Sequence, residues 1–86
     1  MNMVFIKNWL VKQVSIREAE EAHRVNGVSF GFMHDEWESL KSKMLPEDEL
    51  WEFDSGPESW EQLMGWRGYA IVRNGEVVDM VITELN

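Results

Sequence analysis

Glu20 and His23 are the side chains whose spacing best fits metal chemistry. A Glu-x-x-His pair projects from one face of a helix, as in carboxylate-bridged metal sites. Such sites need a second copy of the motif and two further carboxylates, and no glutamate lies three residues before His34, the other histidine. The chain has no cysteine, which excludes disulfides and thiolate metal sites. We therefore expect no metal site and no other cofactor.

Acid–base catalysis by paired carboxylates is a second chemistry that the residue types allow. Glu52 and Asp54 form the best-placed pair, because they lie beside Trp51 and Phe53 and such chemistry needs one carboxyl in an apolar setting. However, the alternation along residues 49–53 places Glu52 opposite both rings, so we expect it to face solvent. No catalytic residue is assigned. An enzyme or small-ligand protein that uses carboxylates near Trp51, Phe53 and the N-terminal helix is kept as an alternative.

Acidic residues dominate the charge of the chain. Sixteen acids against eight bases give a formal net charge of −8, which repels phosphate backbones and anionic membranes. We expect neither direct nucleic-acid binding nor membrane binding. Seven acids with no base among them fall between residues 47 and 61: Glu47, Asp48, Glu49, Glu52, Asp54, Glu58 and Glu61. The run predicts a solvated acidic surface, and its alternatives are a docking surface for a basic partner or a nucleic-acid mimic.

Aromatic residues are the main core material of this small chain. It has 86 residues and five tryptophans, and each ring can bury about 150 to 250 Å². We expect most of the tryptophans in the core, with one or two as alternative interface anchors. Trp66 and Arg67 belong to the types enriched in binding hot spots. The alternative for this pair is an indole packed beneath a short helix, with Arg67 in solvent.

The element that the sequence defines best is a C-terminal hairpin. Asn74-Gly75 predicts a type I′ turn between strands 68–73 and 76–84. The expected register places Ile71 opposite Val78 and Tyr69 opposite Met80. One face then carries Tyr69, Ile71, Val78, Met80 and Ile82, and we expect it to pack on helices.

The second face of this hairpin is unusually apolar. It carries Ala70, Val72, Val77, Asp79, Val81 and Thr83. We expect either the N-terminal segment or another subunit to cover it. The predicted interface residues are accordingly Trp66, Arg67, Val72, Val77 and Val81.

Helices and further strands precede the hairpin. Capping boxes at Ser15–Glu18 and Ser55–Glu58 predict helices over 16–25, ended by Asn26-Gly27, and over 57–64. A third helix follows Phe32, buries a stripe of Trp37, Leu40 and Met44, and stops at Pro46. Strands are expected over 28–32 and 49–53, the latter pairing with strand 76–84, and strand is favoured over helix for residues 1–14. The prediction is a single α+β domain, residues 1–86, with a small, mainly antiparallel sheet packed against two or three short helices.

Residues 47–86 carry a resemblance. The segments from Asp48 to Phe53 and from Gly68 to Val78, with Trp60 and Gly65 between them, resemble a pattern in small bacterial and phage proteins. The resemblance implies a bacterial or phage origin and brings no activity and no residue roles.

The functional prediction is a small acidic module that acts through protein contacts, with a homodimer as one form. Residues 1–7 lack the features of a signal peptide, and no apolar run approaches the ~20 residues that span a bilayer, so a cytoplasmic protein is expected.

Overall fold

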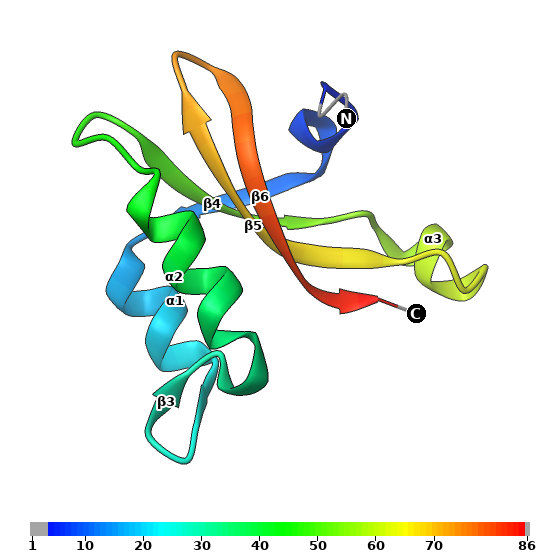
Figure 1. Ribbon diagram of the computed structural model, residues 1–86. Helices are drawn as coiled ribbons and strands as arrows, with labels where there is room; N and C mark the ends of the chain where they lie inside the picture. The colour runs from blue at the N-terminus through cyan, green and yellow to red at the C-terminus, as the bar shows by residue number, and fades with distance from the viewer. Residues whose placement is uncertain (1–3, 86) are drawn as a thin grey trace.

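The fold is organised around a four-stranded antiparallel sheet (Figure 1), in a computed structural model that describes residues 4–85. Its strands are β1 (Leu10–Val14), β4 (Glu49–Asp54), β5 (Trp66–Arg73) and β6 (Glu76–Leu85), in the spatial order β1-β4-β5-β6. The predicted α+β class, strand 49–53 and the C-terminal hairpin are confirmed.

The pairing partner of β4 differs from the prediction. β4 pairs with β5, with Trp51 opposite Ala70, and β6 is left at the edge of the sheet. The reason lies in the two strands of the hairpin. Residues 68–72 of β5 form a continuous run buried on both faces, as suits a central strand, whereas β6 carries acids along its length, as suits an edge.

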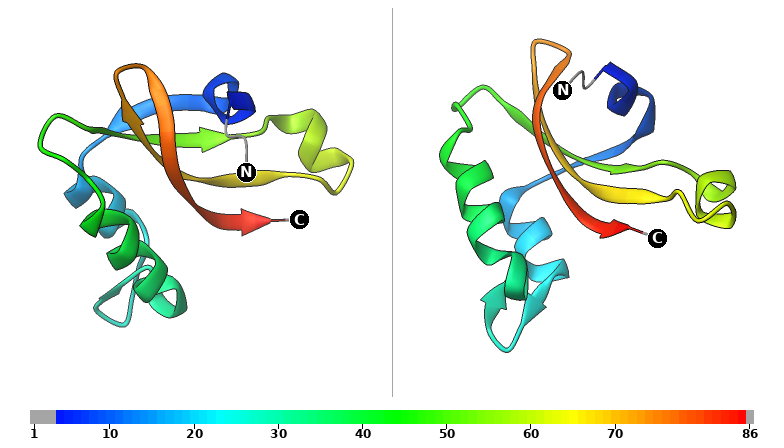
Figure 2. Two further views of the ribbon diagram at one scale, coloured as in Figure 1. Left: turned by 45° about the horizontal axis from the view of Figure 1, so that its top comes forward. Right: turned by 45° about the vertical axis from the view of Figure 1, so that its right-hand side comes forward.

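Helical elements cover both faces of the sheet (Figures 1 and 2). Helices α1 (Ile16–Ala22) and α2 (His34–Ser42) lie on one face, where Trp37 and Leu40 form a core with Tyr69 and Ile71. The 3₁₀ helix η1 (Val4–Trp9) lies on the other face, where the fully buried Ile6 packs into a second core with Phe53 and Ala70. The N-terminal segment therefore covers Ala70 and Val77 of the predicted second face of the hairpin. None of the helices within residues 4–85 is both long and apolar enough to cross a bilayer.

A β-bulge in β6 corrects the predicted register. Val72 pairs with Val77, but Ile71 pairs with Asp79, so Val78 is an extra residue. Beyond it the pairs are Ala70 with Met80 and Tyr69 with Val81. The extra residue exchanges the two faces: Val81 joins the helix-side core, and Met80 and Ile82 pack against the η1-side core, the reverse of the prediction.

The N-terminal prediction is half right. Residues 10–14 are a strand, but Val4–Trp9 is a 3₁₀ helix, and residues 1–3 of the predicted strand lie outside the described part. The helical turn brings Ile6 and Trp9, three residues apart, onto the same side, where both pack against the sheet.

The first capping box is confirmed, but the helix that follows it is shorter than predicted. Ser15 Oγ accepts from the Glu18 N–H at 3.0 Å, and a Glu18 carboxylate oxygen accepts from the Ser15 N–H at 2.9 Å. Helix α1 ends at Ala22. Asn26-Gly27 forms the turn of a small hairpin, β2 (Arg24–Val25) with β3 (Val28–Ser29), and its φ values of 52° and 81° nearly match the 52° and 79° of Asn74-Gly75. The dipeptide therefore makes a type I′ hairpin turn instead of ending a helix.

The predicted strand 28–32 stops at Ser29. Phe30 adopts a left-handed φ of 63°, and the 3₁₀ helix η2 (Gly31–Met33) follows and leads into α2. Phe30 is buried against Trp37, with ring centroids 4.4 Å apart, whereas Phe32 is 97% exposed. The expected alternation of buried phenylalanines is therefore wrong, because the chain turns at Phe30.

The second capping box does not form. Ser55 Oγ accepts from the Trp66 N–H at 2.9 Å, and helix α3 (Pro57–Glu61) begins after Gly56, without a side-chain cap. The helix ends three residues earlier than predicted. The chain then folds back so closely that a Cβ at Gly65 would lie 2.2 Å from the Trp60 ring, and only glycine fits there.

Candidate interaction surface

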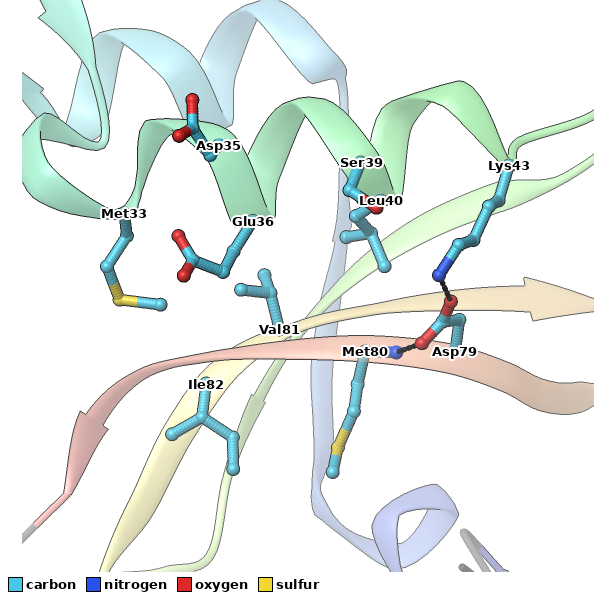
Figure 3. Close-up of a pocket in the computed structure, with 10 residues that line it drawn as sticks. All are labelled: Met33, Asp35, Glu36, Ser39, Leu40, Lys43, Asp79, Met80, Val81 and Ile82. Atoms are coloured by element: carbon cyan, nitrogen blue, oxygen red, sulfur yellow. Dashed lines mark hydrogen bonds and ion pairs between the residues drawn. The ribbon is translucent and has the colours of Figure 1, made fainter.

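A groove between α2 and the edge strand β6 is the largest hollow that we describe (Figure 3). We call it the β6 groove. Its volume is about 580 Å³, and its apolar lining consists of Met33, Leu40, Met80, Val81 and Ile82. In Figure 3, Val81 points toward α2, and Met80 and Ile82 point away from α2, on the opposite side of the strand. The groove therefore lies along a strand at the free edge of the sheet, and this strand carries apolar side chains on both of its faces.

The polar lining of the β6 groove comes mainly from α2. It consists of Asp35, Glu36, Ser39, Lys43 and Asp79. Glu36 points toward β6, whereas Asp35 points away from it (Figure 3). Both lie in the first turn of α2, where negative charge suits the helix dipole, as predicted.

Asp79 connects the helix to the free edge. One of its carboxylate oxygens accepts from Lys43 Nζ at 3.0 Å, and the other accepts from the Met80 N–H at 2.8 Å. The Met80 N–H therefore points away from β5, and by the alternation of an antiparallel ladder the Ile82 N–H points to the same free edge. The side chains of Lys43 and Asp79 are 60% and 26% exposed, so a cation from another molecule can reach this carboxylate.

The predicted interface residues separate into buried and exposed ones. Val72 and Val81 are 6% and 7% exposed and belong to the interior, and the half-buried Val77 packs against the η1-side core. Trp66 meets Trp9 edge to face, with ring centroids 5.8 Å apart. Arg67, with its side chain 44% exposed, is the one exposed residue among these five.

Arg67 is nevertheless tied into the end of the sheet. Its Nε and Nη2 donate to Asp54 at 3.2 and 3.1 Å, its Nη1 donates to Glu84 at 3.2 Å, and its guanidinium lies over the Trp60 ring at 5.1 Å. The hydrogen bond to Asp54 is the main cause that raises the pKa of Arg67. This arrangement holds α3 against β5.

The acidic run 47–61 is divided by internal contacts. Asp48 accepts two hydrogen bonds from Arg73, at 2.8 and 2.7 Å, and its side chain is fully covered. Glu49 accepts from the Trp51 indole at 2.9 Å, and Glu52 lies 3.8 Å from Lys12. Three other members of the run, Glu47, Glu58 and Glu61, are exposed. The run therefore does not form one continuous acidic face.

The carboxylates considered for acid–base or metal chemistry serve the fold. Burial raises the pKa of Asp54, but hydrogen bonds from Gly56, Trp60 and Arg67 outweigh it, so this pKa lies below its usual value. Hydrogen bonds from Lys41, at 2.6 Å, and Trp37, at 2.8 Å, lower the pKa of Glu20.

The histidines are placed by packing. His23 stacks on Phe30 at 4.9 Å, and His34 Nδ1 lies 3.0 Å from the Ser29 carbonyl oxygen. Within residues 4–85, no three His, Asp or Glu side chains are grouped so that they could hold a metal ion.

The sequence-based interpretation missed the β6 groove. Its one local signal is Asp79, a lone acid inside the apolar run from Val77 to Ile82, which is typical of an edge strand protected by charge. Glu36 and Lys43 could not be linked to it from the sequence, because α2 reaches β6 only through the tertiary fold. No family model, curated protein or solved structure matches the chain.

Proposed function

We propose that this chain is a small, acidic, cytoplasmic protein-interaction module that binds a protein partner along the free edge of β6. The observation that carries the proposal is the β6 groove, which runs beside a ten-residue edge strand. A long edge strand offers outward N–H and C=O groups to an added strand. The apolar lining offers pockets for alternate side chains of that strand.

A neighbouring exposed aromatic ring supports the same location. Phe32 is 97% exposed and lines a second hollow, of about 330 Å³, that shares Met33 with the β6 groove. Exposed aromatic rings beside an apolar groove are typical anchors of an interface. Phe32 therefore extends the proposed binding surface along the C-terminal part of β6, beside Thr83.

The other predicted functions lack an observation of this kind. The pKa values of Asp54 and Glu20 are lowered, which does not suit a general acid at neutral pH. A nucleic-acid mimic needs acids spaced on the surface like phosphates, and Asp48 and Asp54 are instead paired with arginines. The resemblance of residues 47–86 to bacterial and phage proteins is compatible with any of these functions.

The test is photocrosslinking in the native cell followed by reconstitution. A crosslinker at Ser39, which lines the groove, should capture a partner that a crosslinker at Gln62, beside α3, does not. The purified partner should shift the amide resonances of residues 79–83. Phe32→Ala should weaken binding without lowering thermal stability, and the matched control Leu63→Ala, at a side chain 74% exposed beside α3, should leave binding unchanged. A partner that shifts resonances elsewhere and leaves residues 79–83 unaffected would refute the proposal.

A further inference from the structure

The charge of β6 determines which strand its edge can accept. The strand carries Glu76, Asp79 and Glu84 and no basic residue. Glu76 lies opposite Arg73, and Glu84 pairs with Arg67, so the two bases beside these glutamates both belong to β5. On the α2 side of the edge, Lys43 is bound to Asp79, and the exposed Arg24 lines the neighbouring hollow together with Thr83.

A second copy of this chain fits that edge poorly. If two β6 strands pair antiparallel about Met80, Glu76 of each copy lies opposite Glu84 of the other. If they pair about Asp79, the two Asp79 carboxylates face each other. Parallel pairing in register places every acid beside its own counterpart. Pairing about Val81 avoids direct opposition, because it places Asp79 opposite Thr83, but it still brings two acidic edges together with no base on either strand. Like charges destabilise a strand pair, so a basic strand fits this edge better than a second copy does.

We infer that the β6 groove accepts an extended, basic segment of a partner protein, with lysine or arginine at alternate positions. This inference rests on the proposed function and specifies its partner. Side chains of an added strand alternate between the two faces of the sheet. Those on the α2 side meet Glu36 and Asp79, and those on the other side extend the apolar surface of Met80 and Ile82.

Asp79 acts as the selecting residue in this arrangement. Without a partner its carboxylate covers the Met80 N–H and binds the exposed Lys43. A basic strand supplies a cation that replaces Lys43 and a carbonyl oxygen that accepts from the Met80 N–H. A neutral or acidic strand supplies no such cation, so Asp79 stays in place and blocks this part of the edge.

Three short peptides test the inference on the intact protein. One alternates lysine with valine, and the other two carry glutamine or glutamate in place of every lysine. The lysine peptide should shift the amide resonances of residues 79–83. Raising the salt concentration from about 0.05 to 0.3 M should weaken its binding. The glutamine peptide should bind about fivefold more weakly, because it loses several charge pairs that each contribute a small amount.

Two double variants provide the matched control. Glu36→Gln with Asp79→Asn should weaken binding of the lysine peptide about three- to tenfold, because Glu36 is exposed and Asp79 is half-buried, so each charge pair contributes modestly. Glu47→Gln with Glu61→Gln removes the same charge outside the groove and should change binding less than about twofold.

The possible failures are distinguishable. Equal binding of the lysine and glutamine peptides at residues 79–83 would overturn the basic partner and leave strand addition standing. Shifts confined to other acids would also overturn the inference. If the protein alone is a dimer whose β6 amides are protected from exchange, the occupant is a second copy and the inference is wrong. If no peptide or protein shifts these resonances, the proposed function fails as well.

Discussion

Replacing Trp37 by phenylalanine should remove one of the two hydrogen bonds that α2 donates to Glu20 of α1. Trp37 is 0% exposed, and its indole N–H donates to Glu20 Oε2 at 2.8 Å. A hydrogen bond to a charged group contributes about 1.5 to 3 kcal/mol. The smaller ring also leaves a void, which adds about 1 kcal/mol. We therefore expect Trp37→Phe to lower the free energy of unfolding by about 2.5 to 4 kcal/mol, a large part of the roughly 5 to 15 kcal/mol typical of a domain.

Urea unfolding followed by far-UV circular dichroism measures this change without relying on tryptophan emission. Trp51→Phe is the matched control, because its indole also donates to a carboxylate, Glu49 at 2.9 Å, but on an exposed part of the surface. We expect the control to cost less than about 1 kcal/mol. In a double-mutant cycle, Trp37→Phe and Glu20→Ala should show a coupling of about 1.5 to 3 kcal/mol. Equal costs for the two tryptophans, or no coupling with Glu20, would refute this account of the α1–α2 contact.

Two further predictions concern the hairpin. Hydrogen bonds from Arg73 lower the pKa of Asp48 from 3.8 to about 2, so the stability that they add is present above pH 3.8 and is lost as the pH falls toward 2. Asp48→Asn should therefore flatten the decline of the urea midpoint between these pH values, and an unchanged decline would contradict this prediction. Deleting Val78, the extra residue of the bulge, should leave a folded chain that is destabilised by about 1 kcal/mol, with Asp79 still opposite Ile71 in the amide spectra. If the regular register were correct, the deletion would exchange the faces of β6 and unfold the chain.

Elements with local signals were predictable from the sequence. The Asn74-Gly75 turn, the Ser15 capping box and the Trp37–Leu40 stripe each depend on residues within a few positions of one another. The β4 strand followed from alternation, and Leu50 and Phe53 do lie in different cores.

The wrong predictions arose where the same residue pattern suits two alternative local structures. An Asn-Gly pair with positive φ can end a helix or turn a hairpin, and the choice at Asn26 depends on Val25 and Val28 pairing beyond it. Ser55 could cap a helix, but its hydroxyl binds the N–H of Trp66, eleven residues away. Asp48 likewise finds Arg73 at a separation of 25 residues, so the acidic run could not be divided correctly from the sequence.

The bulge at Val78 is the step that connects the fold to the proposed site. In a regular hairpin Asp79 would face Ala70, beside Ile6 and Phe53 in the η1-side core, where a carboxylate is costly to bury. Because Val78 is the extra residue, Asp79 instead lies opposite Ile71 and reaches Lys43 on α2, and Met80 takes the place facing Ala70. One residue thus moves an acid to the α2 side of a free strand edge and an apolar side chain to the other side. The cost of burying Asp79 favours the bulged register, but the sequence alone does not show it, because Ile6 and Phe53 close that core only in the tertiary fold.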